Sequence, residues 1–390
     1  MNRLFKLRTL GYAEVEEELW FPNLYFNGLL KLNKRTGRVD IAGTFPNYEI
    51  SRGWLYSAAY YVNGTLVFVP NESKEIAAYD METGKFIITP LDPEWIGEKK
   101  TYFAKAYVYR NFVYLFPLGA KCMVRYDAAD HSVKYLDNCI RELLQALPEN
   151  SYGLYQQFEV IGEKIYMPFL EKNAVAVFDL KDEKTEICYL DITGGCSTIN
   201  YRDGFFYLAS WEKPEIYRWN MESGEILTYK SFPEDADGGK IFLYACLVGD
   251  TLLFFPEQRD RVLSLSVKTG EIKRLYKMCN ADGEAKNTFF VQKTREGFCI
   301  LTSDMEEPHI LSYEAGRLEI KAVCRLDQAY NRRKISDYLL REGYYRGCLE
   351  AEKGLECFVE VVSGAGRRER TGEEMSGWGE RIFRQIRREP

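Results

Sequence analysis

The chain has 390 residues, of which 46% are hydrophobic and 15% aromatic, so it can bury a large core. Its formal charge of −6 argues against nonspecific binding of nucleic acid, and no apolar run reaches the ~18 residues that a membrane span needs. The first twenty residues lack the apolar stretch and the small-residue cleavage site of a secretory signal. We therefore expect a cytoplasmic protein that neither binds nucleic acid nor spans a membrane.

One sequence pattern recurs along the chain. An apolar run ends at Pro or a small residue, and a turn follows fourteen residues later, most clearly at Pro70 with Gly84 and at Pro256 with Gly270. The turn positions are 37, 84, 131, 182, 224, 270 and 316, and they are spaced by 47, 47, 51, 42, 46 and 46 residues. Seven copies at this spacing are typical of a radial repeat.

Residues 54–90 indicate what one repeat forms. Asn63 and Gly64 predict a tight hairpin turn, and Gly84 can take the positive φ of a second turn. The aromatic and β-branched residues typical of strands lie around these turns, at 54–62, 65–70, 76–80 and 85–89. Four antiparallel strands per repeat match one propeller blade. The sequence thus predicts an all-β fold, a seven-bladed β-propeller of four-stranded antiparallel blades over residues 1–326.

Carboxylates recur at the end of the third strand in several repeats, at Asp80, Asp127 and Asp179. A repeated carboxylate could indicate acid–base catalysis, but Asp before a tight turn accepts hydrogen bonds from the turn amides. We interpret these residues as turn residues.

The motif Y-D-x-x-T-G at 79–84, with relaxed copies at 219–224 and 265–270, resembles the repeats of quinoprotein-like and kelch-like β-propellers. The resemblance covers about residues 10–326 and implies architecture only, with no catalytic residue.

The best candidate for a binding face is the one shared by the loops between second and third strands and by the connections between blades. Cations and aromatic rings lie there just before or at the inner strands, and together they would suit an anionic or sugar ligand. The candidate ligand-binding residues are Arg52, Trp54, Lys100, Tyr102, Tyr155, Lys240, Phe242, Lys286 and Phe289. Glutamates in the same loops leave the alternative of an ordinary solvated rim of mixed charge.

No residue pattern indicates a catalytic centre, a metal or a cofactor. The ten cysteines include no C-x-x-C pair and are interpreted as core residues, and two histidines are too few for an imidazole metal site. We therefore expect a non-catalytic propeller that binds a ligand or a protein as an interaction scaffold. The alternative is a lyase or hydrolase that acts on a carbohydrate or modified peptide at the central channel, with Tyr155, Glu159 and His131 as candidates. His131 replaces the turn glycine of its repeat, which favours a surface turn for it.

Two segments depart from the repeat. The connection 136–157 contains apolar residues at helical spacing, so a short helix is expected there, either covering the channel mouth or packing between blades. After residue 326 we expect a helical extension at 327–363, then a linker and a basic amphipathic helix at 364–390. The apolar stripe of this last helix is the expected protein-partner surface; the alternatives are docking on its own propeller and contact with an anionic membrane surface. The stripe consists of Trp378, Ile382, Phe383 and Ile386.

Overall fold

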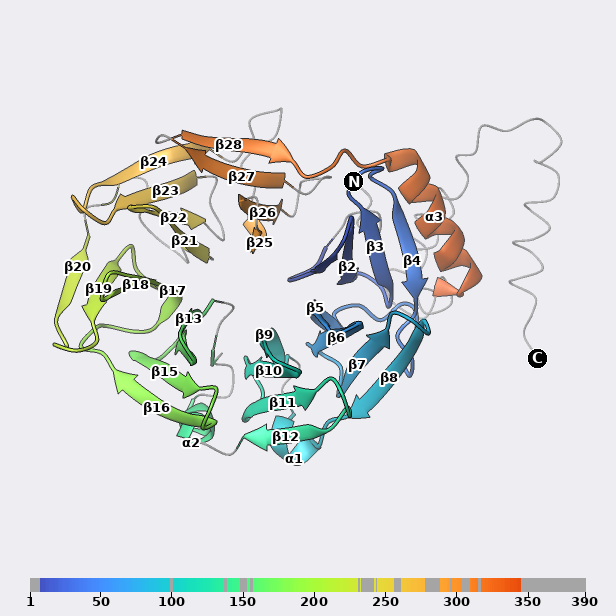
Figure 1. The fold of residues 1–390 in the computed structure, drawn as a ribbon, viewed down its shortest axis with the longest axis horizontal. Coiled ribbons are helices and arrows are strands. Elements are labelled where there is room, and N and C mark those ends of the chain that lie inside the picture. The colour runs from blue at the N-terminus through green and yellow to red at the C-terminus, as the bar shows by residue number, and fades with distance from the viewer. Residues whose placement is uncertain are drawn as a thin grey trace, which may run out of the picture.

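A computed structural model describes residues 8–98, 101–136, 139–147, 153–154, 157–230, 232, 242, 244–255, 261–277, 288–294, 297–302, 309–314 and 317–344. Figure 1 shows its strands in seven four-stranded antiparallel sheets around a common centre. Within each sheet the strands follow one another in chain order from the centre to the rim. The predicted seven-bladed β-propeller is confirmed, and each repeated turn lies between the third and fourth strand of a blade.

The strands of blades 1 to 4 are, in chain order, β1 (Ala13–Val15), β2 (Glu18–Pro22), β3 (Leu29–Asn33), β4 (Val39–Gly43), β5 (Tyr56–Val62), β6 (Thr65–Pro70), β7 (Glu75–Asp80), β8 (Lys85–Pro90), β9 (Phe103–Tyr109), β10 (Phe112–Pro117), β11 (Met123–Asp127), β12 (Val133–Leu136), β13 (Glu159–Ile161), β14 (Lys164–Pro168), β15 (Ala174–Asp179) and β16 (Lys184–Tyr189). Those of blades 5 to 7 are β17 (Cys196–Arg202), β18 (Phe205–Ser210), β19 (Ile216–Asn220), β20 (Ile226–Tyr229), β21 (Tyr244–Val248), β22 (Thr251–Phe255), β23 (Arg261–Ser266), β24 (Ile272–Lys277), β25 (Thr288–Thr294), β26 (Gly297–Thr302), β27 (His309–Glu314) and β28 (Arg317–Ala322). The helices are α1 (Pro93–Ile96), α2 (Cys139–Gln145) and α3 (Gln328–Arg341).

The burial of each strand follows its position in the blade. In β6 and in β10 the five residues after the first are all buried, because neighbouring blades cover both faces of the sheet. The outermost strands are different, and β8 and β12 are mostly exposed or half-buried. The continuous apolar runs of the sequence are therefore the second strands, which lie inside the ring.

The recurring turn residues have the geometry that the sequence predicts. Asn63 and Gly64 have φ values of 45° and 86°, as a two-residue hairpin turn requires. Asp80 accepts hydrogen bonds from the backbone amides of Glu82 and Thr83, both at 2.9 Å, and Asp179 accepts two in the same way. These bonds, that of Thr83 first, hold the pKa of the Asp80 carboxyl below its ordinary value. The repeated carboxylates thus stabilise turns.

The short helix α2 packs between blades. Ile140 is fully buried and Leu144 nearly so, in a cluster that includes Phe116 of blade 3 and Ile165 of blade 4. Figure 1 places α2 at the rim beside β16, away from the centre of the ring. A helix in this connection is confirmed, and of the two positions expected for it, packing between blades is the one observed. Its apolar stripe is satisfied by the cores of two blades, so the helix stays at the rim.

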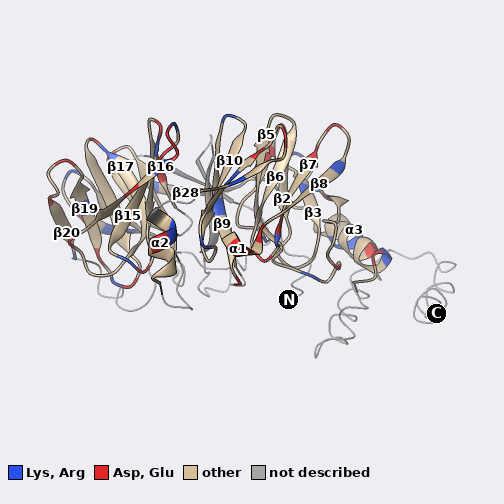
Figure 2. Cartoon of the chain, turned by 90° about the horizontal axis from the view of Figure 1, so that it is seen from below, with Lys and Arg blue, Asp and Glu red and all other residues tan. Residues whose placement is uncertain are grey.

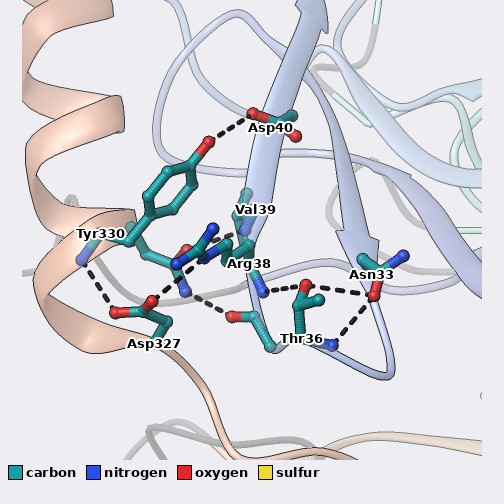
Figure 3. Close-up of polar contacts among 9 residues, drawn as sticks. Asn33, Thr36, Arg38, Val39, Asp40, Asp327 and Tyr330 are labelled. Carbon is teal, nitrogen blue, oxygen red and sulfur yellow. Dashed lines mark hydrogen bonds and ion pairs between the residues drawn. The ribbon is translucent and has the colours of Figure 1, made fainter.

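The helix α3 packs on the outer side of blade 1. It begins at the predicted position, with Asp327 as its N-cap, and buries Ile335, Tyr338 and Leu339 against β4 and its neighbours. Figure 3 shows the polar contacts of the same interface, where Tyr330 donates a hydrogen bond to Asp40 at 3.0 Å. The last 46 residues, 345–390, lie outside the described part of the chain, and so do the four expected partner-binding residues.

Among the described residues, no helix is long and apolar enough to cross a membrane.

Candidate binding site in the central channel

The structure describes the side chains of only four of the nine candidate ligand-binding residues. Outside the described residues lie Lys100, Tyr155, Lys240 and Lys286. Phe289 belongs to β25, and its side chain is not described. The expectation of a ring of cations therefore stays a prediction.

Arg52 and Trp54 lie on the expected face, each with a polar neighbour. Arg52 forms an ion pair with Glu72 at 2.9 Å, and 57% of its side chain is exposed. The guanidinium of Arg8 lies 5.6 Å from the ring of Trp54. Figure 2, which views the ring edge-on, shows acidic and basic residues interspersed around it rather than separated by sign. This is the mixed charge of the solvated-rim alternative.

Tyr102 and Phe242 are buried in blade cores. Tyr102 is 3% exposed and its backbone carbonyl accepts hydrogen bonds from three consecutive amides of the loop that begins at Leu118. Phe242 is 1% exposed and its ring lies 4.8 Å from that of Phe254. Both side chains are part of the packing between strands rather than of an open face.

A different set of residues encloses a cavity of about 350 Å³ at the centre of the ring. These residues come from the innermost strands of six blades, or from the residues just before them. The lining consists of Tyr12, Ala13, Glu14, Ala59, Tyr60, Tyr61, Lys105, Ala106, Tyr107, Gln157, Phe158, Tyr244, Val291 and Gln292. A cavity of this volume is large enough for a small ligand.

Two glutamines hold the walls of this cavity in place. Gln157 donates hydrogen bonds to the carbonyls of Ile199 and Ala245, both at 2.8 Å, and accepts one from the amide of Ala245. Gln292 bonds in the same manner to both backbone groups of Tyr12. The innermost strands of a propeller present an open backbone edge to the channel, and these amides satisfy part of that edge. They join blades that share no strand.

Lys105 is the one cation among the described lining residues. It lies on β9, and its Nζ donates a hydrogen bond to the carbonyl of Leu10 at 2.6 Å, reaching from blade 3 to the segment that enters blade 1. The side chain is partly accessible but surrounded by protein, and this burial lowers the pKa of Lys105 to about 7. The amine is therefore close to half protonated at neutral pH.

Five tyrosines belong to the remaining wall, more than any other residue type. The hydroxyl of Tyr60 accepts a hydrogen bond from the amide of Ala106 at 3.2 Å, and burial raises the pKa of Tyr60 to about 12. Burial also raises the pKa of Tyr244. Both phenols therefore stay protonated and can donate a hydrogen bond. Tyr107 packs edge-on against Phe158, with 5.7 Å between ring centroids.

The accessible residues of the lining show where the cavity opens. Tyr61 is 45% exposed and Glu14 is exposed as well, and each lies two residues before the first hairpin turn of its blade. In an antiparallel meander the first hairpin lies at the opposite end from the loop between second and third strands. The cavity thus opens at the end of the ring opposite to the face that the sequence favoured. Lys105 in an otherwise apolar inner strand was the signal that could have indicated it.

The residues named for the enzyme alternative lie apart. His131, with φ of 64°, lies in the outer turn of blade 3, where its Nδ1 is 2.8 Å from the hydroxyl of Tyr126. Glu159 begins the inner strand β13 of blade 4, and Tyr155 is not described. Within the described residues, no three His, Cys, Asp or Glu side chains are grouped as metal ligands would be.

Comparisons with known proteins agree on the fold. No protein-family model matches the chain, and no curated protein matches it. Among solved structures, virginiamycin B lyase from Staphylococcus aureus has a TM-score of 0.56 at 12% identity, over 77% of this chain and 93% of that one. A chain of the mitotic checkpoint complex has a TM-score of 0.54 at 10% identity, over 83% of this chain and 89% of that one. The chain is a β-propeller. At these identities the likeness extends to the propeller fold alone, which supports enzymes and interaction scaffolds alike.

Proposed function

We propose that this propeller is a non-catalytic binding protein that holds a small ring-bearing molecule in its central cavity. The observation that supports the proposal is the composition of the cavity, where Lys105 is the one cation among the described lining residues and five of those residues are tyrosines. An amine or ammonium donates hydrogen bonds to a carboxylate or carbonyl oxygen, and aromatic walls pack against a flat ring. An aromatic or sugar ring with such an oxygen therefore matches the site.

The enzyme alternative has less support. Catalysis by acid and base requires both groups within hydrogen-bond reach of the substrate. Glu159 belongs to an inner strand of blade 4, whereas His131 is held in an outer turn of blade 3 by Tyr126. These two residues belong to different blades, and neither lines the cavity.

Saturation-transfer NMR on the full chain tests the proposal with two probes, benzoate and methyl glucoside. Benzoate should receive saturation from the protein, and the signal should fall several-fold in Lys105→Met, which keeps most of the side-chain volume but removes the amine. The matched control is Lys85→Met, at an exposed position on the outer strand β8, where the signal should not change.

Tyr61→Ala provides a second variant, at an exposed position that can be changed without emptying a core. It should weaken the benzoate signal because the aromatic ring of benzoate loses one of the side chains that it packs against. Saturation of neither probe, or equal saturation in wild type, Lys105→Met and Tyr61→Ala, would contradict the proposed function.

A further inference from the structure

Exposed cations gather on the outer rim of blade 1. They come from the turn between β3 and β4, from the segment that leads into α3, and from α3 itself. These residues, which we call the rim patch, are Arg35, Arg38, Arg325, Arg333 and Lys334. Figure 1 shows α3 on the outer side of the ring, so the rim patch is separate from the central cavity.

Backbone contacts hold the three segments of the rim patch together. The carbonyl of Gly37 accepts a hydrogen bond from the N–H of Asp327 at 3.0 Å. A side chain at residue 37 would overlap the backbone of Arg325, so the glycine permits this close approach. The turn itself is fixed, since the side chain of Asn33 accepts a hydrogen bond from the amide of Arg35 at 3.1 Å.

Two of the arginines lie over one aromatic ring. The guanidinium carbon of Arg38 is 4.7 Å from the centroid of the Tyr330 ring, and that of Arg333 is 6.0 Å from it. The backbone N–H of Tyr330 donates to Asp327 at 3.1 Å, and its hydroxyl donates to Asp40 at 3.0 Å (Figure 3). Because the ring is held at both ends, a partner meets guanidiniums whose positions are already restricted, which lowers the entropy cost of binding.

The hydrogen bond of Arg38 leaves most of its donors available. Asp327 accepts this bond from Nε of Arg38 at 3.2 Å. The two terminal nitrogens carry the remaining N–H groups, and together they can bind a carboxylate through two parallel hydrogen bonds. In the part of the chain that the structure describes, Arg35, Arg325 and Arg333 form no ion pair. The rim patch therefore presents guanidinium groups that can still bind an anion.

We propose that the rim patch binds an acidic segment of a partner protein, through the Asp and Glu side chains of that segment. Only two carboxylates pair with the five cations, those of Asp40 and Asp327, so the patch keeps an excess of positive charge. Asp337 and Glu342, towards the C-terminal end of α3, mark where this excess ends. A short acidic segment matches the sign and the small extent of the patch. Such binding is independent of the proposed function, since it does not involve the cavity.

Other anionic partners fit the rim patch less well. The whole chain has a charge of −6, so the surface outside the patch is acidic and would repel a long polyanion such as a nucleic acid. Proteins that bind an anionic membrane surface usually combine cations with apolar side chains that insert. The described large hydrophobic side chains that are exposed lie on blades 2, 4 and 5, and none of them lies on blade 1 or α3.

Fluorescence anisotropy on the full chain tests the proposal, with fluorescein-labelled hexaglutamate as the probe at low ionic strength. The wild type should bind the probe saturably, and the dissociation constant should rise at least about fivefold in the double variant Arg35→Gln/Arg333→Gln. Both positions are exposed, so the variant should fold as the wild type does, and urea unfolding verifies this. The matched control is Lys85→Gln/Lys181→Gln, which removes the same charge at exposed positions of blades 2 and 4 and should leave the affinity unchanged.

Two further probes check the class of partner: oligothymidylate, and vesicles of phosphatidylcholine with phosphatidylserine. Neither should bind as tightly as hexaglutamate. Absence of hexaglutamate binding, or equal affinity in the two double variants, overturns the proposal. Tighter binding of the oligonucleotide or of the vesicles overturns the acidic protein segment as the partner.

Discussion

Lys105 shows how one residue of a regular strand can differ in environment from its neighbours. The strand β9 has the buried apolar residues expected of a blade strand, namely Phe103, Ala104 and Ala106. A lysine in this context loses hydration, and the neutral form is favoured as a result. Such a residue lowers the stability of the folded chain, which is a cost that functional residues often impose.

The lysine makes the stability of the protein depend on pH. The folded chain releases the proton of Lys105 near pH 7, whereas the unfolded chain holds it to about pH 10. Between these pH values the unfolded chain binds more protons, so the free energy of unfolding should rise with pH, by on the order of 3 kcal/mol. In Lys105→Met this rise should be absent.

Urea unfolding of wild type, Lys105→Met and Lys85→Met at about pH 7, 8 and 9.5 measures the effect. The difference between wild type and Lys105→Met should change with pH, and the difference between wild type and Lys85→Met should stay constant. Parallel curves for all three proteins would show that Lys105 titrates normally.

Other residues were predictable because they serve the repeat. Asp80, Asp179 and Gly84 recur at equivalent positions, and a local turn explains each of them. Lys105 does not recur, and the carbonyl that it contacts lies 95 residues earlier. The cavity is an outcome of tertiary structure, since six blades contribute to its wall. Sequence periodicity therefore predicted the scaffold of the site and missed its position.

At the scale of elements, α3 covers the outer edge of blade 1. The side-chain amide of Asn331 accepts a hydrogen bond from the backbone N–H of Val39 at 2.7 Å and donates one to the carbonyl of Gly37 at 2.9 Å. Asn331 is buried, so water cannot replace these bonds. One side chain thus takes the place of a neighbouring strand at an edge that would otherwise be open.

Replacing Asn331 by Ala should therefore destabilise the protein. The buried N–H of Val39 would lose its acceptor in Asn331, while the carbonyl of Gly37 would keep the N–H of Asp327 at 3.0 Å. The loss is expected to cost about 1–3 kcal/mol of the free energy of unfolding. The matched control on the same helix is Lys334→Ala, whose exposed ion pair with Asp40 should contribute less than about 1 kcal/mol. Equal losses in the two variants, measured by urea unfolding, would contradict this role of Asn331.

Glu183 joins two blades. It lies in the turn between β15 and β16 of blade 4, and its carboxylate receives Arg125 at 2.6 Å and Lys134 at 2.5 Å from blade 3, and Tyr114 at 3.1 Å. Burial alone would raise the pKa of Glu183, but the hydrogen bonds from Lys134 and Arg125 outweigh it and hold the pKa below its ordinary value. The contact is a further link between sheets that share no strand.

The charge of Glu183 should stabilise the protein above about pH 4.3, and this contribution should be lost as the pH falls through the lowered pKa. Glu183→Gln lacks the titrating group, so its unfolding free energy should fall less steeply than that of wild type below about pH 5. Acid titration followed by tryptophan fluorescence compares them, with Glu82→Gln in an exposed turn as control. Identical acid profiles for wild type and Glu183→Gln would show that the charge of Glu183 does not stabilise the contact between blades 3 and 4.

At the scale of the whole molecule, the ring closes without exchanging a strand. Blade 1 consists of β1 to β4 and blade 7 of β25 to β28, each from consecutive strands. The seam between them has the hydrogen bonds of Gln292 to Tyr12. The chain then leaves β28, crosses the seam and places Cys324 and Leu326 in the core of blade 1 before α3 begins. The last described segment of the chain therefore fastens blade 7 to blade 1.

The repeat predicted seven blades because each copy is a local unit, with pairing between adjacent strands. It did not predict how the ring closes, since closure depends on residues that occur once. Asn331 and Gln292 form contacts across 292 and 280 residues of sequence. The helical stripe of Ile335, Tyr338 and Leu339 was visible, but not the surface that it covers.

Removing the segment that crosses the seam should loosen blades 1 and 7 before the others. A chain ending at residue 322 loses α3, and with it the apolar cover of β4 and the bonds of Asn331. Amide hydrogen exchange should then rise by at least about tenfold in β1 to β4, and less in blades 3 to 5, because local opening follows the loss of local contacts.

A chain ending at residue 344 retains α3 and is the matched control, with blade 1 protected as in wild type. A uniform rise over all seven blades, or no rise in blade 1, would show that the seam closes by itself.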